Sequence, residues 1–174
     1  VAVAEVTVAL IVSTYRRLMV QWNDLNIRGV YGEGFSSDWG RFHELTGKRV
    51  GIVGLGQIGS RVAKRLAGWE CEIVYSDVVS HSAEYESAAG AVRVDFDELI
   101  ETSDVISLHV PLDRSTEKIL SDREFGRMKP GAIVINACRG PVVDEAALIR
   151  ALDDGQIAGA GLDVTEIEPV EMTN

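Results

Sequence analysis

The chain contains few cysteines, few basic residues and no apolar segment long enough to cross a bilayer. Its two cysteines, Cys71 and Cys138, have neither metal-ligand nor disulfide-framework spacing, so we expect reduced thiols of a cytoplasmic protein and no metal site. There are 17 basic residues against 27 acidic ones, and the net charge of −10 disfavours nucleic acid and anionic membranes as partners. Glu5 interrupts the apolar opening VAVAEVTVALIV, which also lacks the basic start and cleavage site of a secretory peptide.

Glycine, by contrast, is plentiful, and three glycines lie where a nucleotide-binding turn needs them. They are Gly54, Gly56 and Gly59 in residues 48–77, which read KRVGIVGLGQIGSRVAKRLAGWECEIVYSD. Gly54 permits a tight turn after an apolar run, and Gly59 lets the following helix pack closely on the sheet. A second apolar run then leads to Asp77, 18 residues beyond Gly59, which is the context that the dinucleotide-binding fingerprint requires.

The same stretch predicts which cofactor groups would be bound. Gly56 has no side chain, so a pyrophosphate can approach the backbone, and the N–H groups of Gln57 and Ile58 at the helix start would face it. The Asp77 carboxylate would accept hydrogen bonds from the adenosine ribose and repel a 2′-phosphate. Residues 78–81 offer no arginine or lysine to reverse that preference. We therefore predict NAD, not NADP; the alternative is a glycine-rich turn without a ligand.

Apolar runs alternate with helical patterns after residue 48, which predicts an α/β Rossmann fold with a doubly wound parallel sheet. We expect one domain over residues 1–174, with a leading helix (1–22), a connector (23–47) and a sheet core (48–163). The expected strands are 49–54, 72–76, 91–94, 104–110, 132–137 and 157–163, and the expected helices are 2–20, 57–68, 95–102, 121–128 and 143–153.

Four local interpretations accompany this assignment. Helix 2–20 is predicted to be mostly buried, and Asp95 to cap the helix that follows it. Residues 78–90 are expected to be irregular. The connector's aromatics (Tyr31, Phe35 and Trp39) indicate an ordered segment, either in a subunit contact or in a local cluster.

Ligands of open parallel sheets bind beyond the carboxyl ends of the strands. That rule selects Asp77, His109 to Pro111, Ala137 to Gly140, and Asp163. Arg139 at this edge can hold a carboxylate in bidentate fashion and polarise a neighbouring carbonyl. The alternative is a structural ion pair, for example with Asp144 or Asp163.

Four further residues have two interpretations each. Glu168 can orient and charge an imidazole, or lie solvated in a loop. Asp163 can accept a hydrogen bond from a carboxamide, or cap a turn. His109 is a candidate base because it is a histidine, but its position beside Pro111 favours a role in lining a cofactor. An ordinary half-buried histidine is an equal alternative. Cys138 has no histidine nearby in sequence, so a small buried residue is favoured over a nucleophile.

Five ordered motifs together resemble the D-isomer-specific 2-hydroxyacid dehydrogenases, over nearly the whole chain from about Ala4. They are GLGQIG, HVPL (109–112), NACRG (136–140), VVDEAAL (142–148) and GAGLDVTEIEP (159–169). The resemblance implies an NAD-dependent oxidoreductase of two domains that acts on a small 2-hydroxy or 2-keto acid and forms a homodimer through this domain. Residues 164–174 would then begin the crossover back to a substrate domain.

Matching motif positions imply roles for individual residues. Gln57 and Ile58 would contact the pyrophosphate and Asp77 the ribose, while Val110 and Pro111 would line the adenine side. Ala137, Cys138 and Asp163 would surround the nicotinamide. Arg139 matches the family's substrate-binding catalytic arginine and Glu168 its histidine-supporting glutamate.

The sequence departs from the family pattern at one point. The family's catalytic histidine follows the Glu-Pro in a Pro-His context, and His43, His81 and His109 do not occupy that position. We therefore expect residues 1–174 to bind NAD without turning over substrate. A different class of function is an NAD-sensing protein similar to the C-terminal-binding-protein corepressors, which share these motifs; an alanine dehydrogenase fits NACRG and DVTEIEP poorly.

Overall fold

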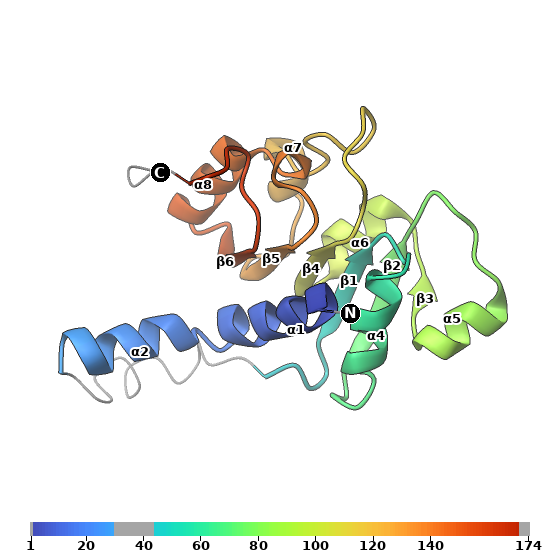
Figure 1. The fold of residues 1–174 in the computed structure, drawn as a ribbon, viewed down its shortest axis with the longest axis horizontal. Coiled ribbons are helices and arrows are strands. Elements are labelled where there is room, and N and C mark those ends of the chain that lie inside the picture. The colour runs from blue at the N-terminus through green and yellow to red at the C-terminus, as the bar shows by residue number, and fades with distance from the viewer. Residues whose placement is uncertain (1, 30–43, 171–174) are drawn as a thin grey trace.

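A six-stranded, fully parallel sheet forms the centre of the protein (Figure 1). The computed structural model describes residues 2–29 and 44–170. The strand order is β3-β2-β1-β4-β5-β6, which confirms the predicted doubly wound sheet. The strands are β1 (Arg49–Val53), β2 (Glu72–Ser76), β3 (Val92–Arg93), β4 (Val105–Leu108), β5 (Ala132–Asn136) and β6 (Ile157–Leu162).

Helices cover both faces of this sheet because its central strands are apolar on both sides. β4 and β5 (VISL and AIVIN) are buried at every position, as expected for parallel strands that have a helix on each face. The described helices are α1 (Ala2–Tyr15), α2 (Leu18–Ile27), α4 (Gly59–Leu66), α5 (Ala83–Ala89), α6 (Phe96–Thr102), α7 (Asp122–Phe125) and α8 (Glu145–Asp153), with a 3-10 turn at Gly140–Val142.

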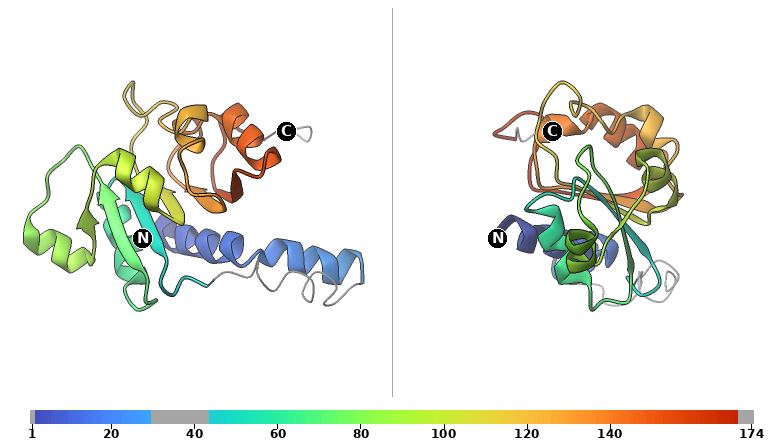
Figure 2. Two further views of the ribbon diagram at one scale, coloured as in Figure 1. Left: turned by 180° about the vertical axis from the view of Figure 1, so that it is seen from behind. Right: turned by 90° about the vertical axis from the view of Figure 1, so that its right-hand side faces the viewer.

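The core divides into one apolar cluster on each face of the sheet. Ile11 of α1 and Leu66 of α4 pack in one cluster, and Leu99 of α6, Phe125 of α7 and Leu148 of α8 pack in the other. Figure 2 shows the helices on the two faces of the sheet from behind and from the side. With every one of these side chains nearly or fully buried, hydrophobic burial on both faces holds the sheet in place.

The chain reverses its direction across the sheet between β1 and β4. Val53 of β1 pairs with Leu108 of β4, and the N–H of His109 donates to the carbonyl of Val53 at 2.8 Å. The two strands therefore end together, which places Gly54 beside His109. This is the topological switch point at which open α/β sheets bind ligands.

Several predicted element boundaries were wrong. The leading helix breaks at Arg17, whose φ of 53° is left-handed, so that α1 ends at Tyr15 and a second helix, α2, runs into the predicted connector. Helix α1 buries one face, whereas α2 has no buried residue, so the prediction of one mostly buried helix fails. The predicted connector aromatics lie outside the described residues.

Two further local predictions need correction. Residues 78–90 contain a helix, α5, whose first turn is capped by the Ser82 hydroxyl accepting from the N–H of Tyr85 at 3.3 Å. Its end carries Gly90 with φ 67°, the usual left-handed stop. Asp95 occupies the N-cap position of α6 as predicted, but its side chain makes no capping hydrogen bond.

Gly59 is one of two positions in the glycine turn, with Gly54, where packing forbids a side chain. A Cβ there would overlap the carbonyl oxygen of Gly54 and lie 3.0 Å from the Cγ2 of Ile52. We expect Gly59→Ala to lower the free energy of unfolding by about 1–3 kcal/mol, because backbone would have to move.

Gly68→Ala is the matched control, because a Cβ at Gly68 has no atom within 4 Å. Its effect should stay within about 0.5 kcal/mol. Urea unfolding of the two variants measures both values, and equal stabilities would contradict the close packing of α4 on β1.

Candidate functional site

A cleft of about 580 Å³ opens at the carboxyl ends of the central strands. Its lining comes from the segments that follow β1, β4 and β5, together with the start of α1. The lining residues are Val3, Ile58, His109, Val110, Pro111, Leu112, Ala137, Cys138 and Arg139. Seven of these were selected from the sequence. Val3 was not, because helix 2–20 was expected only to pack, and Leu112 was not, because the residues selected after β4 end at Pro111. The volume is typical of a small-molecule or cofactor site.

The glycine turn presents unpaired backbone donors beside this cleft. Gly54 has φ 90°, and a Cβ there would lie 2.7 Å from the carbonyl oxygen of His109. Among the described residues, no backbone acceptor is found for the N–H groups of Gly56, Gln57 and Ile58. A Cβ at Gly56 would meet nothing within 4 Å. This open cradle of N–H groups at the start of α4 is suited to an anion.

Asp77 is held against the glycine turn by its own hydrogen bonds. Its Oδ2 accepts from the N–H of Leu55 and its Oδ1 from the N–H of Val79, both at 2.8 Å. His81 Nε2 lies 3.4 Å from Oδ2, and its ring stacks on Tyr85 with centroids 4.6 Å apart. The carboxylate is therefore fixed beside the glycine turn.

Sequence reasoning missed three residues around Asp77. Tyr85 donates its hydroxyl hydrogen to the carbonyl of Leu55 at 3.1 Å, which ties α5 to the glycine turn. Arg93 donates to the carbonyl of Asp77 at 2.8 Å and to the Ser80 hydroxyl at 2.9 Å. The pairing of β2 with β3 brings Arg93 there, so a register prediction could have found it. The contacts of Tyr85 with His81 and Leu55 could not be predicted, because Tyr85 lies on α5, a helix that the sequence analysis did not predict.

His109 lies at the switch point with its imidazole enclosed. Its Nε2 is 2.8 Å from the Ser107 hydroxyl, and its buried Nδ1 has no partner within the described part of the chain. Burial lowers the pKa of His109 to about 4. The ring is therefore neutral near pH 7, which suits a lining residue and argues against a general base.

Asn136 fixes the turn that carries Cys138 and Arg139. The Asn136 Oδ1 accepts from the N–H and the thiol of Cys138, each at 3.1 Å, and its Nδ2 donates to the carbonyl of Arg139 at 3.0 Å. Burial raises the pKa of the Cys138 thiol, so the thiolate is disfavoured. This supports the interpretation of Cys138 as a packing residue and adds Asn136, which sequence reasoning had not selected.

Arg139 stands exposed at the mouth of the cleft. One guanidinium nitrogen donates to the carbonyl of Cys138, and among the described residues no carboxylate lies within ion-pair distance. Asp144, one predicted alternative partner, pairs instead with Lys118 at 3.1 Å. The guanidinium therefore keeps donors for a ligand.

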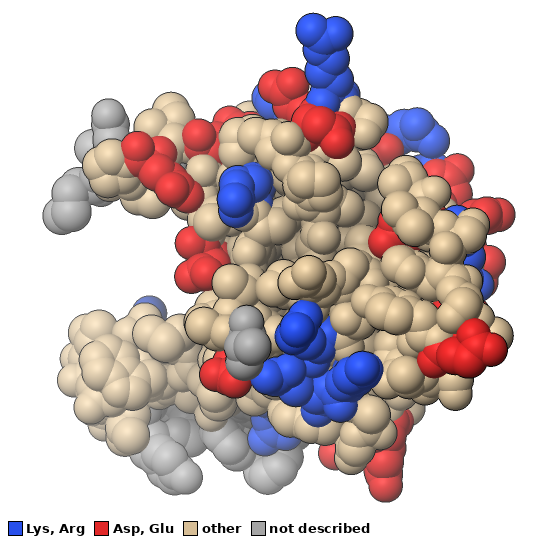
Figure 3. All heavy atoms as spheres, turned by 45° about the vertical axis from the view of Figure 1, so that its right-hand side comes forward, with Lys and Arg blue, Asp and Glu red and all other residues tan. Residues whose placement is uncertain are grey.

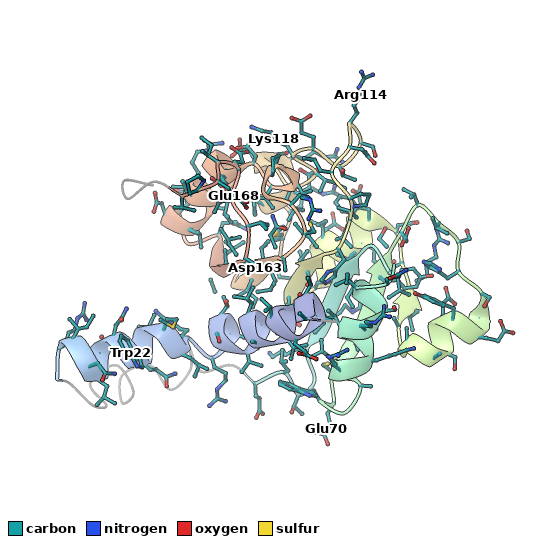
Figure 4. The ribbon with its side chains drawn as sticks, in the orientation of Figure 1. Trp22, Glu70, Arg114, Lys118, Asp163 and Glu168 are labelled. Carbon is teal, nitrogen blue, oxygen red and sulfur yellow. The ribbon has the colours of Figure 1, made fainter. Side chains whose placement is uncertain are left out.

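Asp163 and Glu168 follow β6, on the exposed segment beside this edge (Figure 4). The N–H of Asp163 donates to the carbonyl of Asn136 at 2.9 Å, which continues the pairing of β6 with β5. Glu168 Oε1 accepts from the N–H of Thr165 at 3.1 Å. Within the described residues, Glu168 makes no hydrogen bond to a histidine.

The remaining surface adds little to the site. Figure 3 shows basic side chains in a small group near the lower edge of one face and acidic side chains around its rim. Among residues 2–29 and 44–170 no cluster of three or more histidine, cysteine or acidic side chains could hold a metal. Of the helices described, none has the length and apolar content needed to cross a membrane.

Comparison with known proteins assigns this arrangement to a family. Residues 8–174 match the family described as "D-isomer specific 2-hydroxyacid dehydrogenase, NAD binding domain". The chain belongs to this family. A glyoxylate reductase of Thermococcus litoralis is 44% identical over 174 residues, which cover 97% of this chain and 51% of that protein. The expectation of an NAD-binding domain is confirmed.

Solved structures of two family members share the fold. Apo D-mandelate dehydrogenase of Rhodotorula graminis superposes with a TM-score of 0.91 at 35% identity, over 98% of this chain and 50% of that one. D-lactate dehydrogenase of Lactobacillus jensenii, solved with NAD+, superposes with a TM-score of 0.85 at 34% identity. The match covers 99% of this chain and 52% of that one. The chain spans about half the length of these relatives.

The enclosed His109 predicts a pH-dependent stability. Its pKa falls from the usual 6.5 to about 4 in the folded protein, so between these values the unfolded chain alone is protonated. The free energy of unfolding should therefore drop as the pH falls from 6.5 to 4, by up to about 3 kcal/mol more than in His109→Gln. Urea unfolding at several pH values measures the difference, and parallel curves for both proteins would disprove the enclosure.

Proposed function

We propose that the full-length protein transfers a hydride between the nicotinamide of NAD and C2 of a small D-2-hydroxy or 2-keto acid. The observation that carries this proposal is the position of Arg139. It stands at the mouth of the cleft with no carboxylate partner among the described residues, on a turn fixed by Asn136. A guanidinium so placed can grip a substrate carboxylate and stabilise charge on the reacting oxygen.

The chain's own groups fit the cofactor. The N–H groups of Gly56, Gln57 and Ile58 would bind the diphosphate, and Asp77 would accept from the adenosine ribose hydroxyls. Val110 and Pro111 would line the adenine side. Residues Ala137, Cys138 and Asp163 would surround the nicotinamide. The bound cofactor supplies or accepts the hydride.

Proton transfer is assigned to a histidine outside residues 1–174, supported by Glu168. A neighbouring carboxylate raises the pKa of an imidazole and orients it as an acid and base. His109 is unsuited to this role because its pKa is lowered to about 4. We therefore expect residues 1–174 to bind NADH and to show no dehydrogenase activity.

Glyoxylate is the first keto acid to test, because relatives from Thermofilum pendens and Thermococcus litoralis are named glyoxylate reductases. The proposed homodimer contact is α2. This helix buries no residue within the chain and exposes Leu18, Met19, Val20, Trp22, Leu25 and Ile27. Trp22 stands on α2 where the helix projects from the body (Figure 4). Such an exposed apolar helix is typical of a subunit interface.

Arg139→Gln in the full-length protein tests the proposed substrate contact. The variant should lose roughly 100-fold to 1,000-fold in kcat/KM for glyoxylate, because charge on the reacting oxygen loses its cation. Its dissociation constant for NADH should change little. Steady-state kinetics and fluorescence titration measure the two quantities.

Arg114→Gln is the matched control, because Arg114 points outward from the loop after β4 (Figure 4). It should retain wild-type kinetics. Equal activity of the two variants would remove Arg139 from the reaction.

Asp77→Asn tests the cofactor preference. The asparagine can still accept one hydrogen bond but has no charge, so NADH should bind about tenfold more weakly. NADPH binding should weaken less or improve, because the repulsion of its 2′-phosphate is gone. Calorimetric titration with both cofactors gives the ratio, and an unchanged ratio would separate Asp77 from the ribose.

A further inference from the structure

Two glutamates bind each other's backbone across the carboxyl edge of the sheet. The N–H of Glu166, in the segment after β6, donates to Glu145 Oε1 at 2.6 Å. The N–H of Glu145, at the start of α8, donates to Glu166 Oε1 at 3.4 Å. Each carboxylate accepts from the other residue's main chain, so the pair joins segments that are 21 residues apart.

A lysine from a third segment lies beside Glu166 of this pair and beside the neighbouring Asp144. Lys118 Nζ lies 3.1 Å from Asp144 Oδ2 and 3.7 Å from Glu166 Oε1. Among the described residues, Lys118 is the only cation within ion-pair distance of Asp144 or Glu166. Its main chain is also anchored, because the N–H of Lys118 donates to the carbonyl of Pro141 at 2.8 Å. Lys118 therefore offsets the repulsion between the Asp144 and Glu166 carboxylates.

The joined segments carry the two residues assigned to the reaction. Gly140 follows Arg139, and a Cβ on it would overlap the carbonyl of Thr165 and lie 2.5 Å from the N–H nitrogen of Glu166. Thr165 in turn donates its N–H to Glu168 at 3.1 Å. The turn of Arg139 and the segment of Glu168 are thus in direct backbone contact at the point where Glu166 is bound.

We propose that Glu145, Glu166 and Lys118 form an interloop clamp that positions Glu168 against the turn of Arg139. The inference rests on the function proposed above and adds positioning residues to it. Small displacements of reacting groups are costly in rate, whereas the diphosphate cradle lies on other segments, after β1. Loosening the clamp should therefore lower kcat and leave NADH binding nearly unchanged.

The test uses Glu145→Ala and Lys118→Met in the full-length protein. In both, amide hydrogen exchange over residues 163–168 should accelerate roughly tenfold, while amides of β5 keep their protection. With glyoxylate and NADH, kcat should fall about tenfold and the NADH dissociation constant should stay within about twofold.

Two controls separate positioning from general stability. Glu145→Gln keeps an oxygen that accepts from Glu166, so it should recover most of kcat. Asp153→Ala removes an exposed carboxylate from the same helix and should match the wild type. Unchanged exchange over 163–168 in Glu145→Ala, or faster exchange with unchanged kcat, would overturn the clamp. Absence of turnover in the wild type would instead refute the proposed function, and exchange alone would then decide whether the clamp exists.

Discussion

The pairing of β1 with β4 is the constraint on which the rest of the structure depends. The strand order reverses at this pair, and the two strands end side by side, with the N–H of His109 donating to the carbonyl of Val53 at 2.8 Å. Gly54 fits there only without a side chain, because the His109 carbonyl fills the space that a Cβ would need. The segments that leave this point diverge to opposite halves of the sheet, and the opening between them is the cleft.

Each half of the sheet contributes one chemical function to that opening. The half that begins with β1 supplies uncompensated N–H groups and the Asp77 carboxylate, which are complementary to a diphosphate and a ribose. The half that begins with β4 supplies a neutral His109, the Asn136-fixed turn and the Arg139 guanidinium, which has no carboxylate partner among the described residues. The proposed function thus assigns binding and reaction to different strands, so a substitution in one half should perturb one and spare the other.

Much of this could be predicted from sequence because the signals were local. Continuous apolar runs predicted the six strands, and the glycine spacing with Asp77 predicted the turn between β1 and α4. Helix α5 was missed because AEYESAA lacks a strong apolar face and buries only Ala89. The second leading helix was missed because none of its residues is buried and its apolar side chains stay exposed, so no burial pattern marks it as a separate helix. Arg93, Asn136 and the clamp depend on strand register and on contacts between distant segments, which no single stretch encodes.

The most direct test of the account is to map NADH binding residue by residue on isotopically labelled full-length protein. The amide resonances of Gly56, Gln57 and Ile58 should shift most when NADH is added, together with that of Leu55, whose N–H is bonded to Asp77. Shifts of similar size should appear around Cys138 and Arg139. Saturable binding that leaves the 55–58 amides unmoved would contradict the central claim that this turn holds the cofactor.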